Sequence, residues 1–393
     1  MGRTSTDILK ELVGFASVSA DSNLDIIAYI EARLASLGIA SRRIADRTGR
    51  KASLLATVGP SDRAGVVLSA HTDVVPAEEP DWSSPPFVAT VREGRLYGRG
   101  ACDMKGFIAA VLAQLPALRQ GATETPVHLA FSYDEEVGCR GAPDLVAEVA
   151  GLPARPVLCI VGEPSSLEVA TAHKGKVAYR VTIKGRTGHS ALPHRAANAL
   201  LAGARIAARL GDIAEETASA GRRDDAFDPP YTTVHVGSLH GGSALNLVPD
   251  RAVLEYEIRN IPDRDGVPAL LARIDAGIAA EREKLRRSAP EADILIEEIA
   301  AYPQLGTPAD HRAVGMVARL AGAQAGVRTV SFGTEAGLYA EAGIPTVICG
   351  PGDMTRAHRA DEWIGLDELA AAERMLERLA SKLGRPAANW TTA

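Results

Sequence analysis

A histidine and an aspartate two residues apart follow a short apolar run in the first part of the chain. Residues 65–68, Gly-Val-Val-Leu, are typical of a buried strand that would deliver His71 and Asp73 to its C-terminal edge. On an extended chain, both side chains leave the same face. This spacing suits a metal-bound imidazole whose orientation is fixed by a carboxylate behind it. Taken alone, however, His-x-Asp after a strand is more often part of an ordinary loop.

Acidic residues follow the next two predicted strands of this region. The strand expected at 127–133 leads into Glu135 and Glu136, and the strand expected at 156–161 leads into Glu163. Because ligands of α/β sheets gather at the carboxyl ends of the strands, these residues and His71 are expected to share one site. Carboxylates at one sheet edge would repel each other unless a cation lay among them. The pattern therefore favours a cation site over unrelated surface acids.

Asp103 lies in a glycine-rich loop, GRGACDMKG, that is predicted to run into a helix from about residue 105 to 119. At the start of a helix, backbone N–H groups and the helix dipole favour a carboxylate. An N-cap is therefore the ordinary interpretation of Asp103, and a metal ligand is the alternative.

The composition is that of an ordinary globular protein, with 46% hydrophobic, 4% aromatic and 23% charged residues, which excludes a disordered or fibrous chain. The net charge of -6, from 43 basic and 49 acidic residues, provides no basic field for nucleic acid or an anionic membrane. No apolar run reaches the roughly 18 residues of a spanning helix, and the N-terminus lacks an apolar signal core. A cytoplasmic location is therefore expected. Four cysteines are scattered without a Cys-x-x-Cys motif or a secretory context and are expected to be reduced thiols: Cys102, Cys139, Cys159 and Cys349.

A chain of 393 residues exceeds the usual span of one hydrophobic core, so two domains are expected. The pattern of alternating strands and helices predicts an α/β catalytic domain over residues 1–175 and 301–393. Between them, residues 176–300 predict an inserted α+β domain. Its expected strands are 177–183, 232–239, 252–258 and 294–299, and its expected helices are about 196–210 and 267–287.

The catalytic domain is expected to begin with an amphipathic helix over residues 6–18. A second helix should be capped by Asp21 or Ser22 and ended by Gly38. The polar tail after residue 383 is expected to be loose. The remaining expected elements are strands at 53–58, 329–332 and 345–349 and helices at 311–326 and 366–383.

Eight short motifs follow one another along the chain: SAHTDVVP, GRGACDMKG, YDEEVG, GEPS, GHSALP, NLVPD, FGTEAG and AHRADE. In this order they resemble the aminoacylase/carboxypeptidase family of co-catalytic zinc hydrolases, and within it the acetylornithine deacetylases. The resemblance covers nearly the whole chain. It implies a zinc-hydrolase (phosphorylase/hydrolase-like) catalytic domain, with a central mixed sheet flanked by helices, and an inserted α+β lid and dimerisation domain.

The resemblance also implies a ligand set for two divalent metal ions. Zinc suits a site of histidines and carboxylates without cysteine, and cobalt or manganese can substitute. By the resemblance, Asp103 bridges the ions, His71 and Glu163 complete one site, and Glu136 and His358 complete the other. Glu135 is implied as the general base and Asp73 as the partner of His71.

The implied reaction is hydrolysis of the amide of N2-acetyl-L-ornithine to L-ornithine and acetate, a step of arginine biosynthesis. A hydroxide shared by the two metal ions would attack the carbonyl, with Glu135 transferring the proton to the departing amine. His189 is similar to a lid-domain histidine that reaches the active site of the neighbouring subunit and stabilises the oxyanion, which implies a homodimer. A structural loop histidine is the alternative for His189.

Three residues are candidates for substrate binding. Asn246 and Arg259 resemble family residues that bind the carbonyl and the α-carboxylate, although an exposed strand arginine is the common alternative for Arg259. Glu335 stands where relatives that desuccinylate diaminopimelate carry a small hydroxyl residue, which suggests a pocket wall that favours a cationic side chain. The alternative is a glutamate that binds backbone N–H groups in the first turn of a helix.

Two other classes of function are open. A broad N-acyl-amino-acid amidohydrolase, a dipeptidase or a succinyl-diaminopimelate desuccinylase would use the same metals with a different pocket. A non-catalytic binding protein on the same fold would be expected to lack a metal ligand or the base, and none is missing from this sequence.

Overall fold

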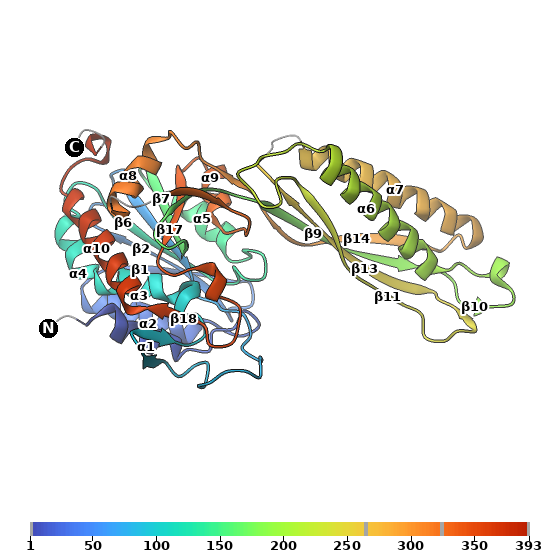
Figure 1. Ribbon diagram of the computed structural model, residues 1–393, viewed down its shortest axis with the longest axis horizontal. Helices are drawn as coiled ribbons and strands as arrows, with labels where there is room; N and C mark the ends of the chain where they lie inside the picture. Colours follow the sequence, from blue (N-terminus) through green and yellow to red (C-terminus); the bar gives the residue numbers. More distant parts are fainter. Residues whose placement is uncertain (1–2, 263–265, 323–325, 391–393) are drawn as a thin grey trace. The chain divides into compact units, whose positions relative to one another are not determined.

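The computed structural model describes residues 3–262, 266–322 and 326–390 (Figure 1). The chain forms two compact units. The first comprises residues 1–173, 305–329 and 334–393, and the second comprises residues 174–304 and 330–333. Each unit has its own hydrophobic core.

The first unit is built around a mixed sheet in the order β1-β2-β6-β3-β7-β17-β8-β15, with β16 paired to β8. The central strands β6, β3, β7 and β17 run parallel, and β2 and β8 pair antiparallel with their central neighbours. This confirms the predicted α/β class with a central mixed sheet. The strands are β1 Ser41–Ala45, β2 Ala52–Val58, β3 Val66–His71, β6 Val127–Ser132, β7 Leu158–Pro164, β8 Val169–His173, β15 Leu305–Gly306, β16 Val327–Val330 and β17 Thr346–Gly350.

Helices enclose this sheet, and strands β3 and β6 are buried at every position. Their near-continuous apolar sequences are typical of strands covered on both faces. The helices of the unit are α1 Ser5–Val13, α2 Leu24–Ser36, α3 Gly106–Ala113, α4 Leu115–Gly121, α5 Ala142–Ala150, α8 Arg312–Ala321, α9 Ala336–Glu341 and α10 Leu366–Lys382.

The first helix is shorter than the predicted span 6–18, because the chain turns extended after Gly14. Ser17 Oγ donates to the Thr72 carbonyl at 2.7 Å, and Val18 forms a bridge with Val74. The second helix ends before Gly38, which has φ 68°, as predicted, but neither Asp21 nor Ser22 occupies its N-cap position, although Ser22 Oγ accepts from the Leu24 N–H at 3.2 Å. Asn23 occupies the N-cap position, and its side chain binds the backbone of β2 instead of capping the helix.

A small antiparallel sheet joins two of the sequence motifs. It has the order β18-β5-β4, with β4 Thr90–Arg92, β5 Arg95–Tyr97 and β18 Trp363–Gly365. Trp363 pairs with Tyr97, so the end of AHRADE lies beside the start of GRGACDMKG. None of these three short strands is evident in the sequence, because none shows a long alternating pattern.

Asp103 is not the N-cap of a long helix, contrary to the simplest sequence interpretation. Residues Ala101–Lys105 form a tight turn in which Asp103 has non-helical angles, φ -119° and ψ 96°. Helix α3 begins only at Gly106, without a side-chain cap, and the predicted helix 105–119 is broken into α3 and α4. The carboxylate of Asp103 is therefore not used to cap α3.

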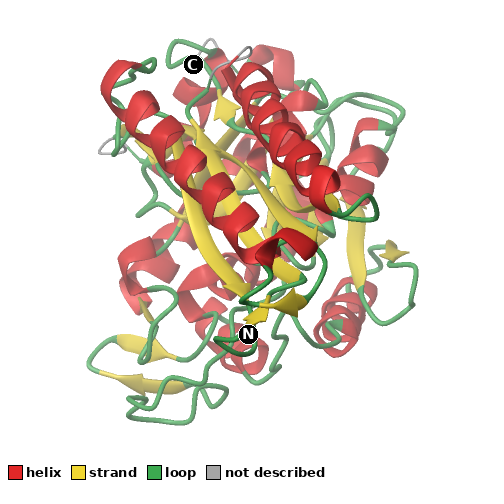
Figure 2. Cartoon of the chain, turned by 90° about the vertical axis from the view of Figure 1, so that its right-hand side faces the viewer, coloured by secondary structure: helices red, strands yellow, loops and turns green. Residues whose placement is uncertain are grey.

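The second unit is an antiparallel sheet in the order β11-β13-β9-β14, and α6 and α7 pack against it (Figures 1 and 2). Its core includes Val181, Leu254 and Ile274. The elements are β9 Gly175–Lys184, α6 Ala199–Ala220, β11 Thr233–Gly241, β13 Arg251–Asn260, α7 Gly266–Ser288 and β14 Asp293–Tyr302, with a short pair of β10 Gly188–His189 and β12 Leu247–Val248.

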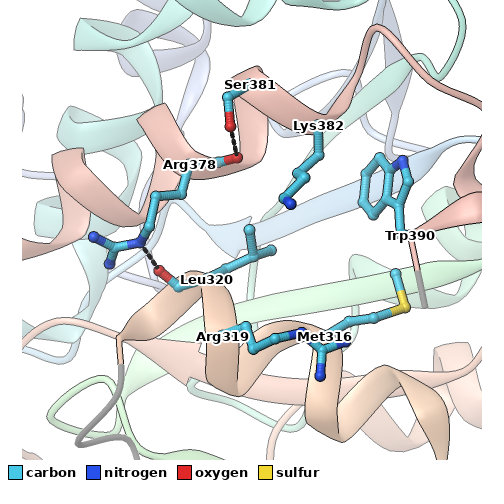
Figure 3. A pocket seen from close by; sticks show the side chains of 7 residues that line it. All are labelled: Met316, Arg319, Leu320, Arg378, Ser381, Lys382 and Trp390. Carbon is cyan, nitrogen blue, oxygen red and sulfur yellow. Dashed lines mark hydrogen bonds between the residues drawn. The ribbon is translucent and has the colours of Figure 1, made fainter. Parts of the chain in front are cut away.

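The described part of the C-terminal tail, which ends at Trp390, is held against the first unit where the sequence predicts a loose tail. Trp390 is buried and lies with Met316 and Leu320 in the wall of a cavity of about 220 Å³ between α8 and α10 (Figure 3). The indole Nε1 donates to the Arg385 carbonyl at 3.2 Å. The error arises because a single aromatic residue in a polar segment gives no periodic signal, although burying one indole is enough to hold the segment.

Among the described helices, none is long and apolar enough to span a membrane by itself; the segments Ala101–Ala113 and Leu115–Gly121 meet that test only as a pair bent by 53°.

His128 makes the stability of the fold depend on pH. It is fully buried on β6, and its Nδ1 lies 3.0 Å from Thr57 Oγ1, while its Nε2 has no hydrogen-bond partner in the described part of the chain. Burial lowers the pKa of His128 to about 4. Below the ordinary histidine pKa of about 6.5, His128 therefore binds a proton in the unfolded chain but not in the folded chain.

We expect the contribution of His128 to lower the free energy of unfolding by up to about 3 kcal/mol as the pH falls from about 6.5 to about 4. A His128→Gln variant should lose this part of the pH dependence, as measured by urea unfolding at several pH values. The exposed His194, replaced by Gln, is the control. Equal slopes for wild type and His128→Gln would contradict the assignment.

Candidate metal centre

The predicted ligands converge because three strands run side by side. β3 pairs in parallel with β6 and with β7, so their carboxyl ends meet at one edge of the sheet. His71 is the last residue of β3, Glu135 and Glu136 follow β6, and Glu163 is the second-last residue of β7. These residues are held on rigid strands or directly after them, as a site of fixed geometry requires.

Asp103 lies between two imidazoles. Its Oδ1 is 3.1 Å from His71 Nε2, and its Oδ2 is 3.2 Å from His358 Nε2. Asp103 and His71 are buried, whereas the His358 side chain is 47% exposed. Each oxygen of the Asp103 carboxylate thus faces the nitrogen of a different imidazole. This arrangement is expected of a group that bridges two cations.

A second acid lies beside each imidazole. Glu163 Oε1 is 3.6 Å from His71 Nε2, and Glu136 Oε2 is 3.1 Å from His358 Nε2. Potential ligand atoms of His71, Asp103 and Glu136 lie within 4.8 Å of one another, and so do those of His71, Glu135 and Glu163. The described residues therefore offer two adjoining groups of nitrogen and oxygen donors.

The Asp73 carboxylate holds the segment that carries both glutamates. It accepts hydrogen bonds from the backbone N–H of Glu135 at 3.1 Å, from that of Glu136 at 3.3 Å and from Ser19 Oγ at 2.7 Å. His71 Nδ1 lies 2.9 Å from the Asp73 carbonyl oxygen and 3.6 Å from its Oδ1. The His71 imidazole is thus oriented mainly by the backbone carbonyl of Asp73. The side chain of Asp73 instead binds the backbone of the segment that follows β6.

The charges of the cluster are balanced by protons in the metal-free fold. Burial raises the pKa of Glu163 well above its usual range, and it raises the pKa of Glu136 to about 7. Burial acts on Asp103 in the same direction, but hydrogen bonds from His358 and His71 outweigh it and lower its pKa. Hydrogen bonds to Asp103 and Glu136 raise the pKa of His358 to about 10. Divalent cations would replace these protons, so this donor set of buried carboxylates and imidazoles fits two such ions.

Glu135 differs from the other acids in its surroundings. Cys139 Sγ lies 3.4 Å from its Oε1, and burial raises the pKa of Glu135 well above its usual range. A carboxylate of raised pKa beside a metal site is suited to accept a proton and return it. The contact with Cys139 was not anticipated, since the sequence gives this cysteine no motif.

Among the described residues, the Glu335 side chain has no exposed surface and so does not face an open pocket, which corrects the sequence prediction. It is fully buried, its Oε1 accepts from Ser69 Oγ and its Oε2 from Ser132 Oγ, both at 2.6 Å. Ser69 Oγ also lies 2.8 Å from Tyr339 Oη. The alternative interpretation fails too, because the side chain makes no capping bond to α9. Hydroxyl groups on two buried strands require an acceptor, and Glu335 provides it.

His189 and Asn246 lie together in the second unit. His189 is exposed on β10, which pairs with β12, and the Ser190 N–H donates to the Asn246 carbonyl at 3.0 Å. The His189 Nδ1 accepts from the Ala191 N–H at 3.1 Å, which leaves Nε2 as the ring nitrogen available to a ligand.

Arg259, in the same unit, is engaged by neighbours on its own sheet. Its Nε donates to Glu257 Oε1 at 2.8 Å, and its Nη1 donates to Tyr302 Oη at 3.2 Å. With one third of its side chain exposed, it is more constrained than an ordinary surface arginine.

Sequence reasoning did not identify Glu362 and Arg99 as a pair. Both are almost fully buried, and Arg99 Nη1 lies 2.9 Å from Glu362 Oε2. The available signal was the presence of both residues within motifs, Arg99 in GRGACDMKG and Glu362 in AHRADE.

Comparisons with known proteins identify the family of this chain. Residues 67–382 match the model of the peptidase family M20/M25/M40. The acetylornithine deacetylase of Myxococcus xanthus is 36% identical over 94% of this chain and 95% of its own length. Three further relatives with the same name are 30–32% identical.

Solved structures share the fold. An M20 family metallo-carboxypeptidase from Sulfolobus solfataricus aligns with a TM-score of 0.75 at 19% identity, over 97% of this chain and 99% of its own. A dinuclear metal-binding peptidase of the M20 family from Bacillus subtilis aligns with a TM-score of 0.66 at 16% identity, over 96% of each chain. On its family match and its full-length relatives, the chain belongs to peptidase family M20/M25/M40 and is a metal-dependent amidohydrolase.

Proposed function

We propose that this enzyme hydrolyses N2-acetyl-L-ornithine to L-ornithine and acetate, a step of arginine biosynthesis. The main observation that supports this proposal is the position of the Asp103 carboxylate between His71 and His358, with a further acid beside each imidazole. The choice of substrate is supported by the relatives named acetylornithine deacetylase. Four buried, unpaired cysteines suit a reducing compartment, and we place the enzyme in the cytoplasm.

Five residues would hold two divalent ions. Asp103 would be shared, with His71 and Glu163 on one ion and Glu136 and His358 on the other. Imidazoles and carboxylates without thiolate suit zinc, and the same donors accept cobalt or manganese. Asp73 would keep His71 in place and would hold the segment that carries Glu136.

When bound, the ions supply a water of lowered pKa and polarise the amide carbonyl. Glu135 accepts one proton from the water as its oxygen adds to the carbonyl carbon. It then returns that proton to the amide nitrogen, and the C–N bond breaks to release the amine. The acetyl carbon keeps the water oxygen, and the second water proton passes from the acid product to the released amine, which gives acetate and an ammonium group, so atoms and charges balance.

Three residues of the second unit are assigned to the oxyanion and the substrate. We assign His189 to the oxyanion, acting on the active site of the partner in a homodimer. Asn246 would bind the carbonyl group of the substrate and Arg259 its α-carboxylate. The free Nε2 of His189 and the rigid setting of Arg259 support these roles.

A broader N-acyl-amino-acid amidohydrolase or a dipeptidase is the second candidate. It gains weight from the burial of Glu335, which removes the acid that was expected to select the cationic side chain of ornithine. A desuccinylase of diaminopimelate would use the same centre. A non-catalytic protein is disfavoured because every ligand and the base are present in the sequence.

Chelation should abolish turnover of N2-acetyl-L-ornithine, and added zinc should restore it. Acetylornithine should be preferred over N-succinyl-diaminopimelate and acetylmethionine, as measured by amine release. Glu135→Gln should lower kcat by roughly 10²–10⁴-fold while the bound metal is retained. Zinc-dependent turnover that favours another substrate would refute the specificity, and no metal-dependent turnover of any amide would refute the site.

His189→Ala should lower kcat by roughly 10²–10³-fold, as expected when an oxyanion donor is lost. If His189 acts on the partner subunit, mixing His189→Ala with Glu135→Gln restores one intact site in each mixed dimer, or about a quarter of wild-type activity. The variants are unfolded together and refolded as a mixture, and each variant refolded alone is the control. An absence of recovery, with mixed dimers present, would place His189 in its own subunit's site.

Glu335→Gln should destabilise the fold by about 1–3 kcal/mol, because the amide nitrogen that replaces one carboxylate oxygen cannot accept from a serine hydroxyl. The KM values for acetylornithine and acetylmethionine should change by the same factor. Ser132→Ala, which removes one of the donors, serves as the matched control. A rise in KM confined to acetylornithine would instead return Glu335 to the substrate pocket.

A further inference from the structure

Three backbone N–H groups around Asp103 point at one carboxylate. The Cys102 and Asp103 N–H groups donate to Glu362 Oε1 at 2.9 and 3.0 Å, and the Gly100 N–H donates to Glu362 Oε2 at 3.0 Å. Because Asp103 has non-helical backbone angles, its N–H group is not held by a helix. Glu362 supplies the acceptor that a helix would otherwise provide.

Glu362 is itself fixed by a buried ion pair. Its side chain and that of Arg99 are each 1% exposed, and Arg99 Nη1 donates to Glu362 Oε2 at 2.9 Å. Arg99 Nη2 also donates to the Pro76 carbonyl at 3.0 Å and to Glu79 Oε1 at 2.8 Å. With four donors on its two oxygens, the Glu362 carboxylate has little freedom to move.

The same residue links the segments of two proposed metal ligands. Glu362 follows His358 by four residues, and its carbonyl oxygen accepts from the Gly98 N–H at 2.9 Å. Directly after it, β18 pairs with β5, which leads into the Asp103 turn. The position of Asp103 relative to His358 therefore depends on contacts that pass through Glu362.

We propose that Glu362 is a positioning residue of the metal centre. Through the N–H groups of Cys102 and Asp103, its carboxylate sets the Asp103 side chain midway between His71 and His358. The inference rests on the proposed function in one respect only, namely that Asp103 binds metal. It does not depend on which amide is the substrate.

The test compares metal affinity in Glu362→Gln and Glu79→Gln. Both changes remove a carboxylate from Arg99, but only Glu362 also accepts from the Asp103 turn. Affinities for cobalt and zinc are measured by competition with a chelator, and the visible absorption of the cobalt protein reports ligand geometry. Glu362→Gln should weaken metal binding by roughly 10–100-fold and alter the cobalt spectrum, as for other residues that support metal ligands. Glu79→Gln should stay within about twofold of wild type.

Thermal unfolding of the metal-free variants separates positioning from a loss of folding. Wild-type metal affinity and cobalt spectrum in a folded Glu362→Gln variant would overturn the inference. If that variant does not fold, Glu362→Asp retains the charge beside Arg99 but retracts the acceptor, and it should show the same loss of affinity. Amide hydrogen exchange of the metal-free wild type provides a test without mutation, since the N–H groups of Cys102 and Asp103 should be protected. Rapid exchange there would also overturn it.

The outcomes for the two proposals are distinct. If the wild-type protein binds two metal ions but does not deacetylate acetylornithine, the proposed substrate is refuted. The role of Glu362 is then decided by the metal affinities of the variants alone. A wild-type protein that binds no divalent metal refutes the centre, and the positioning role with it.

Discussion

Repulsion among carboxylates at one sheet edge is the constraint on which the first unit depends. Asp103, Glu136 and Glu163 converge where water is largely excluded, so their negative charges cannot coexist without positive partners. In the metal-free fold, protons and two imidazoles provide that compensation. Two divalent cations held by the same donors would also provide it. The stability of this edge and its chemistry therefore have the same electrostatic cause.

A second set of acids supports the first without belonging to it. Asp73 holds the segment after β6, Glu362 holds the Asp103 turn, and Glu335 binds serines on β3 and β6. Each is buried and accepts several hydrogen bonds, which makes a buried carboxylate tolerable. Acids around this centre thus divide into those that can contact a cation and those that fix the backbone beneath it.

The fold class and the main elements were predictable, because the central strands are short apolar runs and the helices repeat every three or four residues. Errors occurred where a contact distant in sequence outweighs local preference. The first helix ends at Val13 because Ser17 and Val18 bind residues 72–74, and Trp390 holds a polar tail in place.

The sequence by itself determined which chemistry is available, since strand ends carrying His71, Glu135 and Glu163 follow from local patterns. The tertiary structure alone decided which acids face the centre and which support it. Glu335 and Glu362 could not be assigned, because their partners lie more than 200 residues away in sequence. A carboxylate binds whichever donors or cations the fold places beside it, and only the packed chain specifies those neighbours.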